Sequence, residues 1–389
     1  MSFRWIDVRA AFAVCALLSL VQAVLLWRFR RRLSTEEAPD AGPAPAAAVI
    51  VPFKGLSPGL GEAVRSLLDQ RYPGPLEFLF VAASRNDPVY PELERIAAGS
   101  PAKIRILESK ARPSQCSEVM LNLLHAVSQA SEETQLLLFT DSDLQVPRDW
   151  ALRLSAPLRD PSVGAATSVM LFAPDAPGLW SFLRMVWIGA GLPFFMADPQ
   201  VCGQSMAFRK GDFDRFGVAG LWSRCITTDA PLDRIFRERG LKVAMAAGAA
   251  PVSREACTLR EFLRVFNKWF VYCRTYNPLT WALLAGFLLA KLWVLFWALR
   301  PPVSWGLLAA ALAFDMAYVH QVFAGLSRRF PDYFRTTLLP LAAALAMPAV
   351  FVFYLINLAV SVVQRDIRWG GYLYRIHGPQ RIAVLESPR

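Results

Sequence analysis

Two aspartates, one residue apart, carry the strongest chemical signal in this chain. They lie in the segment Thr140-Asp141-Ser142-Asp143, directly after the apolar run QLLLF. A strand ending there would deliver both carboxylates to the carboxyl edge of a parallel sheet, where open α/β sheets bind ligands. Nearby carboxylates repel each other unless a cation lies beside them, and Mg²⁺ and Mn²⁺ share oxygen ligands with diphosphates. The pair therefore suits a metal–nucleotide–sugar site, although such a tripeptide alone is more often a solvated turn.

The segments that would position this pair alternate in type from residue 47 onward. The strand-like segments are AAVIVPF, LEFLFVAAS, KIRILES and QLLLF. Between them lie the helix-like segments LGEAVRSLLDQRY, DPVYPELERIAAG and residues 117–130. Later helices are expected at 229–239 and 258–274. This alternation predicts an α/β fold with a Rossmann-like, mostly parallel sheet and right-handed crossovers.

Four apolar runs are long enough to cross a bilayer. They cover residues 8–27, 278–299, 303–324 and 337–363. The first is followed at once by Arg28, Arg30, Arg31 and Arg32. Since positive residues favour the cytoplasm, this cluster predicts an N-terminus outside and a globular domain on the cytoplasmic face, in a bacterial inner membrane.

The C-terminal end presents a conflict of topology. Three crossings after a cytoplasmic domain would place the tail outside, yet the tail is rich in arginine. The arginines concerned are Arg365, Arg368, Arg375 and Arg381. One run could be interfacial or re-entrant, and Pro340 and Pro348 in the last run favour a break there. The side on which the tail lies is left open.

Composition agrees with a membrane protein. The chain has 389 residues, 54% of them hydrophobic, and a net charge of +11. With no stripe of basic and aromatic residues, this charge favours an anionic membrane surface over nucleic acid. Six scattered cysteines without a CxxC spacing indicate free thiols in a reducing compartment. No oligomeric state is predicted.

These patterns divide the chain into five parts. Residues 1–33 form an N-terminal transmembrane anchor and 34–46 a linker rich in Pro and Ala. The catalytic domain is expected at 47–276, membrane segments at 277–364 and a basic tail at 365–389.

Residues 47–275 resemble the family 2-like inverting glycosyltransferases with the GT-A fold. The ceramide glucosyltransferase group (family 2/21 type) is the nearest, and the hopanoid-biosynthesis glycosyltransferases are close to it. The resembling segments are VIVPFKG at 49–55, RNDP at 85–88, TDSD at 140–143, GQSM at 203–206, TD at 228–229, KW at 268–269 and WGGY at 369–372. Their order and spacing match over most of the domain, and the flanking spans match too.

The resemblance implies that this enzyme moves a hexose from a UDP-sugar to a lipid hydroxyl, with Mg²⁺ or Mn²⁺ as cofactor. Lys54, Asp87 and Asp141 would contact the nucleotide, and Asp143 together with Asp141 would hold the metal. Asp87 also precedes a helical stretch, so it could simply cap that helix. Both roles can hold for this residue.

Asp229 would be the general base of the inverting reaction. It would take the proton of the acceptor hydroxyl as that oxygen attacks the anomeric carbon, and its charge would favour an oxocarbenium-like transition state. Because Asp229 precedes PLDRIFRERG, it could instead cap a helix.

Lys268 and Trp269 would contact the donor diphosphate. Here Lys268 stands where the family has Arg, and it lacks the bidentate fork of that side chain. Val265 stands where the family has Gln or Arg. A basic juxtamembrane helix that binds lipid head groups is the other interpretation of this segment.

Two further departures leave the substrates open. The segment 115–118 reads QCSE, where the ceramide enzymes carry an element with lysine, and no His-Pro-Arg element lies near 189–197. The alternatives are therefore a ceramide-type transferase, a hopanoid or other lipid glycosyltransferase, and a catalytically impaired membrane scaffold. The aromatic stretch 179–196 is either a helix packed on the sheet or an interfacial helix that admits a lipid acceptor.

Overall fold

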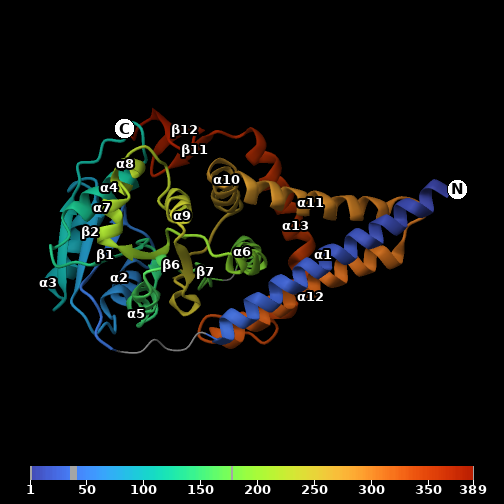
Figure 1. Cartoon of the computed structure of the whole chain (residues 1–389), viewed down its shortest axis with the longest axis horizontal. Coiled ribbons are helices and arrows are strands. Elements are labelled where there is room, and N and C mark those ends of the chain that lie inside the picture. The colour runs from blue at the N-terminus through green and yellow to red at the C-terminus, as the bar shows by residue number, and fades with distance from the viewer. Residues whose placement is uncertain (1, 36–41, 177, 389) are drawn as a thin grey trace. The chain divides into compact units, whose positions relative to one another are not determined.

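The computed structural model describes residues 2–35, 42–176 and 178–388 of the chain (Figure 1). The expected linker at 34–46 lies partly outside these residues. The chain forms two compact units, each built from three separate stretches of sequence. The sheet unit comprises Glu36–Phe172, Pro199–Glu255 and Arg365–Arg389, and the helical unit comprises Met1–Thr35, Ala173–Asp198 and Ala256–Gln364.

The sheet unit is built around a seven-stranded sheet with the strand order β3-β2-β1-β4-β8-β6-β9. The strands are β1 (Ala47–Phe53), β2 (Leu76–Ala82), β3 (Lys103–Glu108), β4 (Leu136–Thr140), β6 (Val163–Thr167), β8 (Ser205–Arg209) and β9 (Lys242–Met245). Strands β1 to β4 are parallel, β8 runs antiparallel to β4 and β6, and β6 pairs with β9 in parallel. The expectation of a mostly parallel α/β sheet is confirmed.

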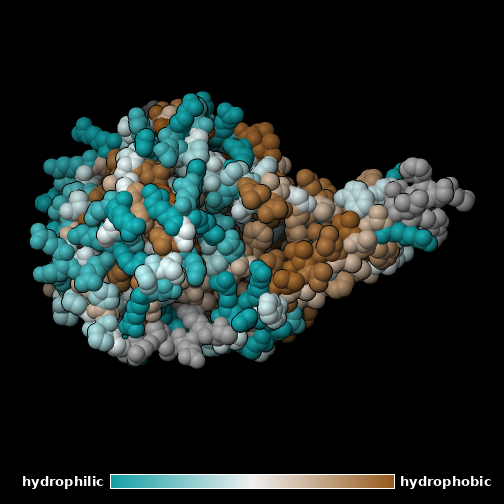
Figure 2. All heavy atoms as spheres, in the orientation of Figure 1, coloured by the Kyte–Doolittle hydropathy of each residue, from teal (hydrophilic) through white to brown (hydrophobic). Residues whose placement is uncertain are grey.

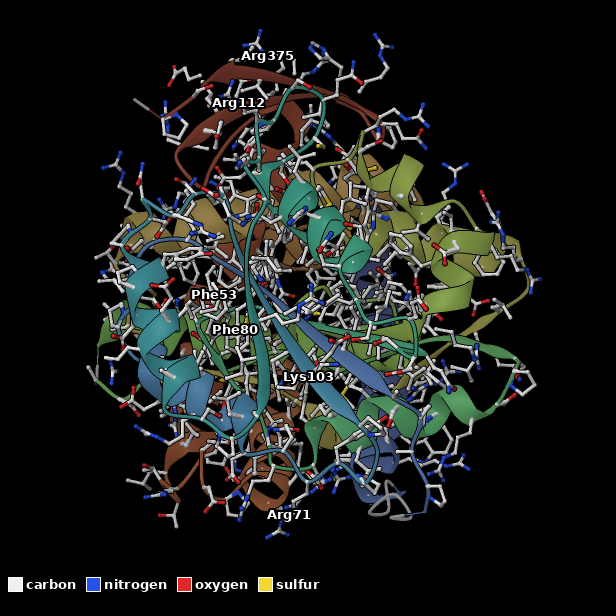
Figure 3. The ribbon with its side chains drawn as sticks, turned by 90° about the vertical axis from the view of Figure 1, so that its left-hand side faces the viewer. Phe53, Arg71, Phe80, Lys103, Arg112 and Arg375 are labelled. Carbon is white, nitrogen blue, oxygen red and sulfur yellow. The ribbon has the colours of Figure 1, made fainter. Side chains whose placement is uncertain are left out.

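The two faces of the sheet belong to two cores, as the alternation of side chains along a strand requires. In β1, Val49 and Val51 enter one core, and Ile50 enters the other. Both faces are covered, which explains why these strands read as continuous apolar runs. Phe53 and Phe80, labelled in Figure 3, meet edge to face with ring centroids 5.1 Å apart.

Helices cover both faces. One core receives α2 (Leu60–Leu68), α3 (Val89–Ala98) and α5 (Trp150–Ser155). The other receives α4 (Glu118–Ser128), α7 (Lys210–Arg215), α8 (Val218–Trp222) and α9 (Asp229–Glu238). The helices expected at 117–130 and 229–239 are therefore present in nearly the expected bounds.

Two small sheets complete the unit. One has the order β5-β10-β7, from β5 (Leu144–Gln145), β10 (Val252–Ser253) and β7 (Leu171–Phe172). The other is antiparallel and consists of β11 (Asp366–Trp369), β12 (Tyr372–Gly378) and β13 (Arg381–Glu386). We name this second sheet the tail sheet. The sequence predicts only a basic tail for its residues. Its Tyr374 is only 1% exposed, so the tail is an integral part of the sheet unit.

The helical unit consists of six helices. They are α1 (Ser2–Thr35), α6 (Leu179–Ala197), α10 (Leu259–Tyr276), α11 (Pro278–Leu299), α12 (Trp305–Arg329) and α13 (Leu339–Val363). All except α10 are long and apolar enough to cross a membrane. Hydrophobic residues gather along the long helices α1, α11 and α12, as Figure 2 shows. The four runs expected from the sequence are helices, and α6 is a fifth candidate.

A charged pair lies among the apolar helices. Lys291 of α11 forms an ion pair with Asp315 of α12, and Gln22 of α1 donates a hydrogen bond of 2.9 Å to Asp315 Oδ1. Ionisable groups among apolar helices pair with one another because an unpaired charge there is costly. The network therefore ties three helices of this unit together.

Candidate functional site

The site is built at the carboxyl edge of the parallel strands. Lys54 follows β1, Asp87 follows β2, and Asp141 and Asp143 follow β4. Because these three strands are parallel neighbours in the sheet, their carboxyl ends share one edge. The structure thus brings together the four residues that the sequence placed at strand ends.

Asp87 links the loop after β1 to the start of α3 through two hydrogen bonds. Its Oδ1 accepts hydrogen bonds from Gly55 N at 2.9 Å and from Val89 N at 3.0 Å. Gly55 has a φ of 67°, a left-handed conformation that favours glycine. The bond to Val89, the first residue of α3, fits the capping role, and the bond to Gly55 holds the loop that carries Lys54. The contact with a nucleotide base stays a prediction.

Lys54 is engaged by a carboxylate and by the tail sheet. Its Nζ lies 2.6 Å from Glu118 Oε1 and 2.5 Å from the carbonyl oxygen of Gly370. It also lies 5.0 Å from the ring centroid of Tyr372, within range of a cation–π contact. Glu118 N in turn donates to the hydroxyl of Tyr374 at 3.2 Å. The tail sheet therefore reaches the edge where the candidate donor residues lie.

Glu118 and Tyr372 set the charges on the side chains around Lys54. Burial, followed by the neighbouring Glu118 carboxylate, raises the pKa of Tyr372 to about 12. The phenol is therefore neutral at physiological pH, and the charge of Lys54 is met by Glu118. In the sequence, Glu118 is recognised only as a departure from the family. The contact between Lys54 and the Gly370 carbonyl could not be predicted, because the two residues lie 316 positions apart in the chain.

Asp229 is held by three hydrogen-bond donors. Its Oδ1 accepts from Thr227 Oγ1 at 2.6 Å and from Ala230 N at 2.8 Å, and its Oδ2 accepts from Gly203 N at 3.2 Å. Asp229 is the first residue of α9, where the positive end of the helix dipole favours a carboxylate. The position fits a helix-end role and leaves the catalytic role as a prediction.

Gly203 allows the loop before β8 to approach Asp229. A Cβ at this position would lie 2.6 Å from Thr228 Oγ1 and 3.5 Å from Asp229 Oδ2. The first distance is shorter than real Cβ contacts, so a larger residue would push this loop away from the carboxylate. The close approach of this loop to Thr228 and Asp229 therefore explains why position 203 is a glycine.

The segment 202–204 links Asp229 to the end of β4, because Gly203 N donates to Asp229 Oδ2 at 3.2 Å and Thr140 Oγ1, directly before Asp141, donates to the Gln204 carbonyl at 2.9 Å. Burial, and then the charges of Asp229 and Asp141, raise the pKa of the Cys202 thiol to about 12. The thiol donates to Gln204 Oε1 at 2.8 Å, and the backbone N–H donates to Thr167 Oγ1 at 2.9 Å. Sequence reasoning missed Cys202, and its position directly before the GQSM segment was the available signal.

The donor set at this edge fits a hard divalent cation. Asp141 and Asp143 are half-buried and lie one residue apart in the short loop between β4 and β5. In the described part of the chain, no group of three or more His, Cys, Asp or Glu side chains is arranged to hold a metal. A cation bound by the two carboxylates would take its remaining ligands from phosphate oxygens and water, as Mg²⁺ commonly does.

Lys268 and Trp269 lie on α10, in the helical unit. Trp269 meets Phe266 edge to face at 5.3 Å and lies 6.5 Å from the ring of Trp187. These contacts make Trp269 part of an aromatic cluster of α6 and α10. The interaction of Lys268 and Trp269 with a donor stays a prediction.

Comparisons with known proteins agree with this architecture. The sequence model described as Glycosyl transferase family 21 matches residues 10–382. The structure of the mannosyltransferase PcManGT from Pyrobaculum calidifontis, in complex with GDP-Man and Mn2+, is similar at a TM-score of 0.51 and 20% identity, over 92% of this chain and 98% of that chain. This likeness confirms the GT-A-like fold.

Two other solved structures are more distant. S. aureus TarS has a TM-score of 0.35 and 13% identity, over 87% of this chain and 60% of that chain. A mycobacterial protein has a TM-score of 0.39 and 17% identity, over 60% of this chain and 76% of that chain. Comparison with curated protein sequences finds no match.

Proposed function

Because this chain belongs to Glycosyl transferase family 21, we propose that it is a membrane-bound inverting enzyme that moves a hexose from a UDP-sugar to a lipid hydroxyl. The segment 202–204, which is hydrogen-bonded both to Asp229 and to Thr140 beside Asp141, carries the proposal. It supports two carboxylates with separate tasks in one site, one for the donor and one for the acceptor. Family membership supports sugar transfer, and the five apolar helices support a membrane location.

The donor occupies the carboxyl edge of the sheet. Asp87 recognises the base, Lys54 and Asp141 contact the nucleotide, and Asp143 with Asp141 would hold Mg²⁺ or Mn²⁺. Such a cation, when bound, would stabilise the charge of the leaving diphosphate. The GDP-Man and Mn2+ of PcManGT support a nucleotide sugar and a divalent cation in this fold. On α10, Lys268 and Trp269 complete the contacts with the diphosphate, with Lys268 acting as a point charge.

Asp229 is the general base. Its Oδ1 already accepts two hydrogen bonds, from Thr227 and Ala230, so Oδ2 is the oxygen that takes the proton. As the acceptor oxygen forms its bond to the anomeric carbon, the bond from that carbon to the diphosphate breaks. The bonding electrons leave with the diphosphate, and the acceptor proton moves to Oδ2.

The acceptor is a lipid of the ceramide type on the cytoplasmic leaflet of a bacterial inner membrane. The long apolar helices support a substrate that is itself embedded in a bilayer. A hopanoid or another lipid is the alternative acceptor. A catalytically impaired scaffold is the alternative function, and the Glu118 carboxylate that occupies Lys54 favours it.

One assay separates these alternatives. The purified full chain in detergent is offered UDP-glucose or GDP-mannose, Mg²⁺ or Mn²⁺, and ceramide, diacylglycerol or a hopanoid. We expect metal-dependent release of UDP that requires a lipid, with a glycolipid product in mass spectrometry. Release of GDP alone would refute the proposed donor, and no release with any combination would support the scaffold.

A matched pair of variants tests the base. Asp229→Asn should lower kcat at least about 100-fold, the usual minimum for a general base. Asp69→Asn removes an exposed carboxylate that pairs with Arg148 and lies between α2 and β2, at the amino end of that strand, and should leave kcat unchanged. Full turnover in Asp229→Asn would show that another group takes the proton.

A further inference from the structure

Helix α6 cannot cross the membrane, although its length and composition would allow it. The chain leaves the sheet unit at Phe172 and returns to it at Pro199, and α6 is the only helix among the described residues between these points. A folded unit with exposed polar backbone lies on one side of a bilayer. Because one crossing would separate two parts of the same unit, α6 stays on the side of the sheet unit.

The same reasoning limits how many of the last three apolar helices can cross the membrane. The chain leaves the sheet unit at Glu255 and returns at Arg365, where the tail sheet begins. The number of crossings between these residues must therefore be even. Since α11, α12 and α13 are three helices, no more than two of them cross.

Helices α1 and α12 run side by side in the same direction. Near their beginnings, a Cβ on Gly306 would lie 3.9 Å from the ring of Phe12. Near their ends, Arg30 Nη2 donates to Gln321 Oε1 at 2.7 Å. The N-terminal anchor and α12 therefore cross together. Helix α11 joins α12 through a short connection and pairs with it through Lys291 and Asp315, so it crosses in the opposite direction.

Helix α13 is consequently the one that does not cross. Its polar residues are buried against α6, where Trp187 Nε1 donates to Asn357 Oδ1 at 3.1 Å and Tyr354 OH donates to the Trp187 carbonyl at 2.6 Å. The side chains exposed along α13 are apolar and include Leu341, Leu345, Val352 and Ile356. Together α6 and α13 form a layer that is joined by these buried polar contacts and exposes apolar side chains along α13.

A cavity of about 630 Å³ lies at one end of this layer. Its lining includes Leu179, Phe182, Met185, Phe334, Arg335 and Leu339. These residues come from the start of α6, the connection between α12 and α13, and the start of α13. The lining is mostly apolar with one guanidinium, the combination expected where a hydrocarbon chain enters and a polar head group stays at the rim.

We propose that this cavity receives the hydrocarbon chain of the acceptor lipid from the leaflet on the side of the sheet unit. The identity of the lipid as acceptor rests on the proposed function. The cavity is continuous with surfaces that face the bilayer, since Leu179 is 62% exposed on its lining and the exposed face of α13 begins beside Leu339. A lipid can therefore enter laterally without leaving the membrane.

Photolabelling tests the proposal. The full chain in phosphatidylcholine vesicles is given ceramide with a diazirine in its acyl chain, or phosphatidylcholine with the same label. After illumination, cross-linked peptides are identified by mass spectrometry. We expect labelled ceramide to concentrate on residues 179–185 and 333–339, above the label on the exposed faces of α11 and α13. Uniform labelling, or equal labelling of these residues by phosphatidylcholine, would overturn the proposal.

Two variants narrow the cavity, and one serves as a matched control. Leu179→Trp and Thr336→Trp each add a ring to the lining, from α6 and from the connection between α12 and α13, and Leu283→Trp adds the same ring at a site of similar exposure on α11, 60% against 62% for Leu179. Each methylene kept out of an apolar cavity weakens binding about fourfold. We expect the two cavity variants to lower labelling at least about tenfold, and the control to leave it unchanged.

The same variants separate this inference from the proposed function. If cavity variants lose labelling but no donor and lipid yield product in the native chain, the lipid site stands and the transferase proposal falls. If transfer is robust and its KM for lipid is unchanged in both Leu179→Trp and Thr336→Trp, the cavity assignment is wrong and the transferase proposal stands.

Discussion

Thr227→Val tests whether Asp229 must be held in one orientation to act as a base. Thr227 Oγ1 donates to Asp229 Oδ1 at 2.6 Å, and valine keeps the shape of the side chain while removing the donor. A hydrogen bond to a charged group contributes about 1.5–3 kcal/mol. If all of it served to orient the carboxylate, kcat would fall about 10- to 150-fold.

The remaining contacts of Asp229 set where in this range the result should lie. Ala230 N and Gly203 N still hold the carboxylate at 2.8 Å and 3.2 Å. Losing the Thr227 donor also makes the carboxylate a stronger base, which opposes the loss of orientation. We therefore expect kcat to fall about tenfold, the lower end of the range, while the KM for UDP-sugar stays unchanged.

Thr134→Val is the matched control for this experiment. Thr134 is also a buried threonine whose hydroxyl donates to a carboxylate, at 2.8 Å from Glu77 Oε1, but it lies away from the site. The readouts are steady-state kinetics with UDP-glucose and ceramide, and thermal unfolding of both variants. An unchanged or higher kcat in Thr227→Val, or an equal loss in both variants, would refute the orientation argument.

Three further outcomes follow from other parts of the molecule. In Asp143→Ala, donor binding measured by calorimetry should lose its stimulation by Mn²⁺, and retained stimulation would remove Asp143 from the metal site. Burial raises the pKa of the Glu77 carboxyl, but hydrogen bonds from Ser131 and Thr134 more than offset this and hold it below its ordinary value of about 4.3. The ionised Glu77 carboxylate therefore contributes fully to stability above its ordinary pKa, and this contribution is lost as the pH falls through the lower pKa of the folded state. The melting temperature of Glu77→Gln should consequently fall less steeply below pH 5 than that of the native chain. A fluorescent protein fused after Arg389 should fluoresce in bacteria, and one fused to a chain truncated after Pro302 should not, because the proposed three-crossing topology places only the first on the cytoplasmic side. The reverse pattern would contradict that topology.

The sequence predicted those parts of the fold that depend on local pattern. The continuous apolar runs of β1 and β4 signalled strands buried on both faces, and the aspartates that follow β4 lie at the expected sheet edge. The apolar run at 278–299 coincides with α11. In each case the signal comes from residues adjacent in the chain, where strand alternation and helix length can be read directly.

The parts that could not be predicted depend on contacts between distant segments. The bond from Lys54 to the Gly370 carbonyl requires the tail sheet to fold and return to β1, which no local pattern indicates. The role of the segment 202–204 follows only once the fold brings Asp229 and the end of β4 into hydrogen-bond contact with it. Hydropathy likewise identifies α6 as able to cross but holds no information about where the chain on either side of it goes.

The tail sheet also removes the topological conflict that the sequence presented. Counting every apolar run as a crossing places the arginine-rich tail outside, against the charge rule. Tyr374 and Gly370 bind Glu118 and Lys54, so the tail must share a side with the donor edge. With α1, α11 and α12 crossing and α13 lying in the surface, Arg28, Arg335 and the tail all fall on one side. The count of runs and the charge rule conflict only if every apolar helix is assumed to cross, and the return of the chain to the sheet unit after α13 excludes that assumption.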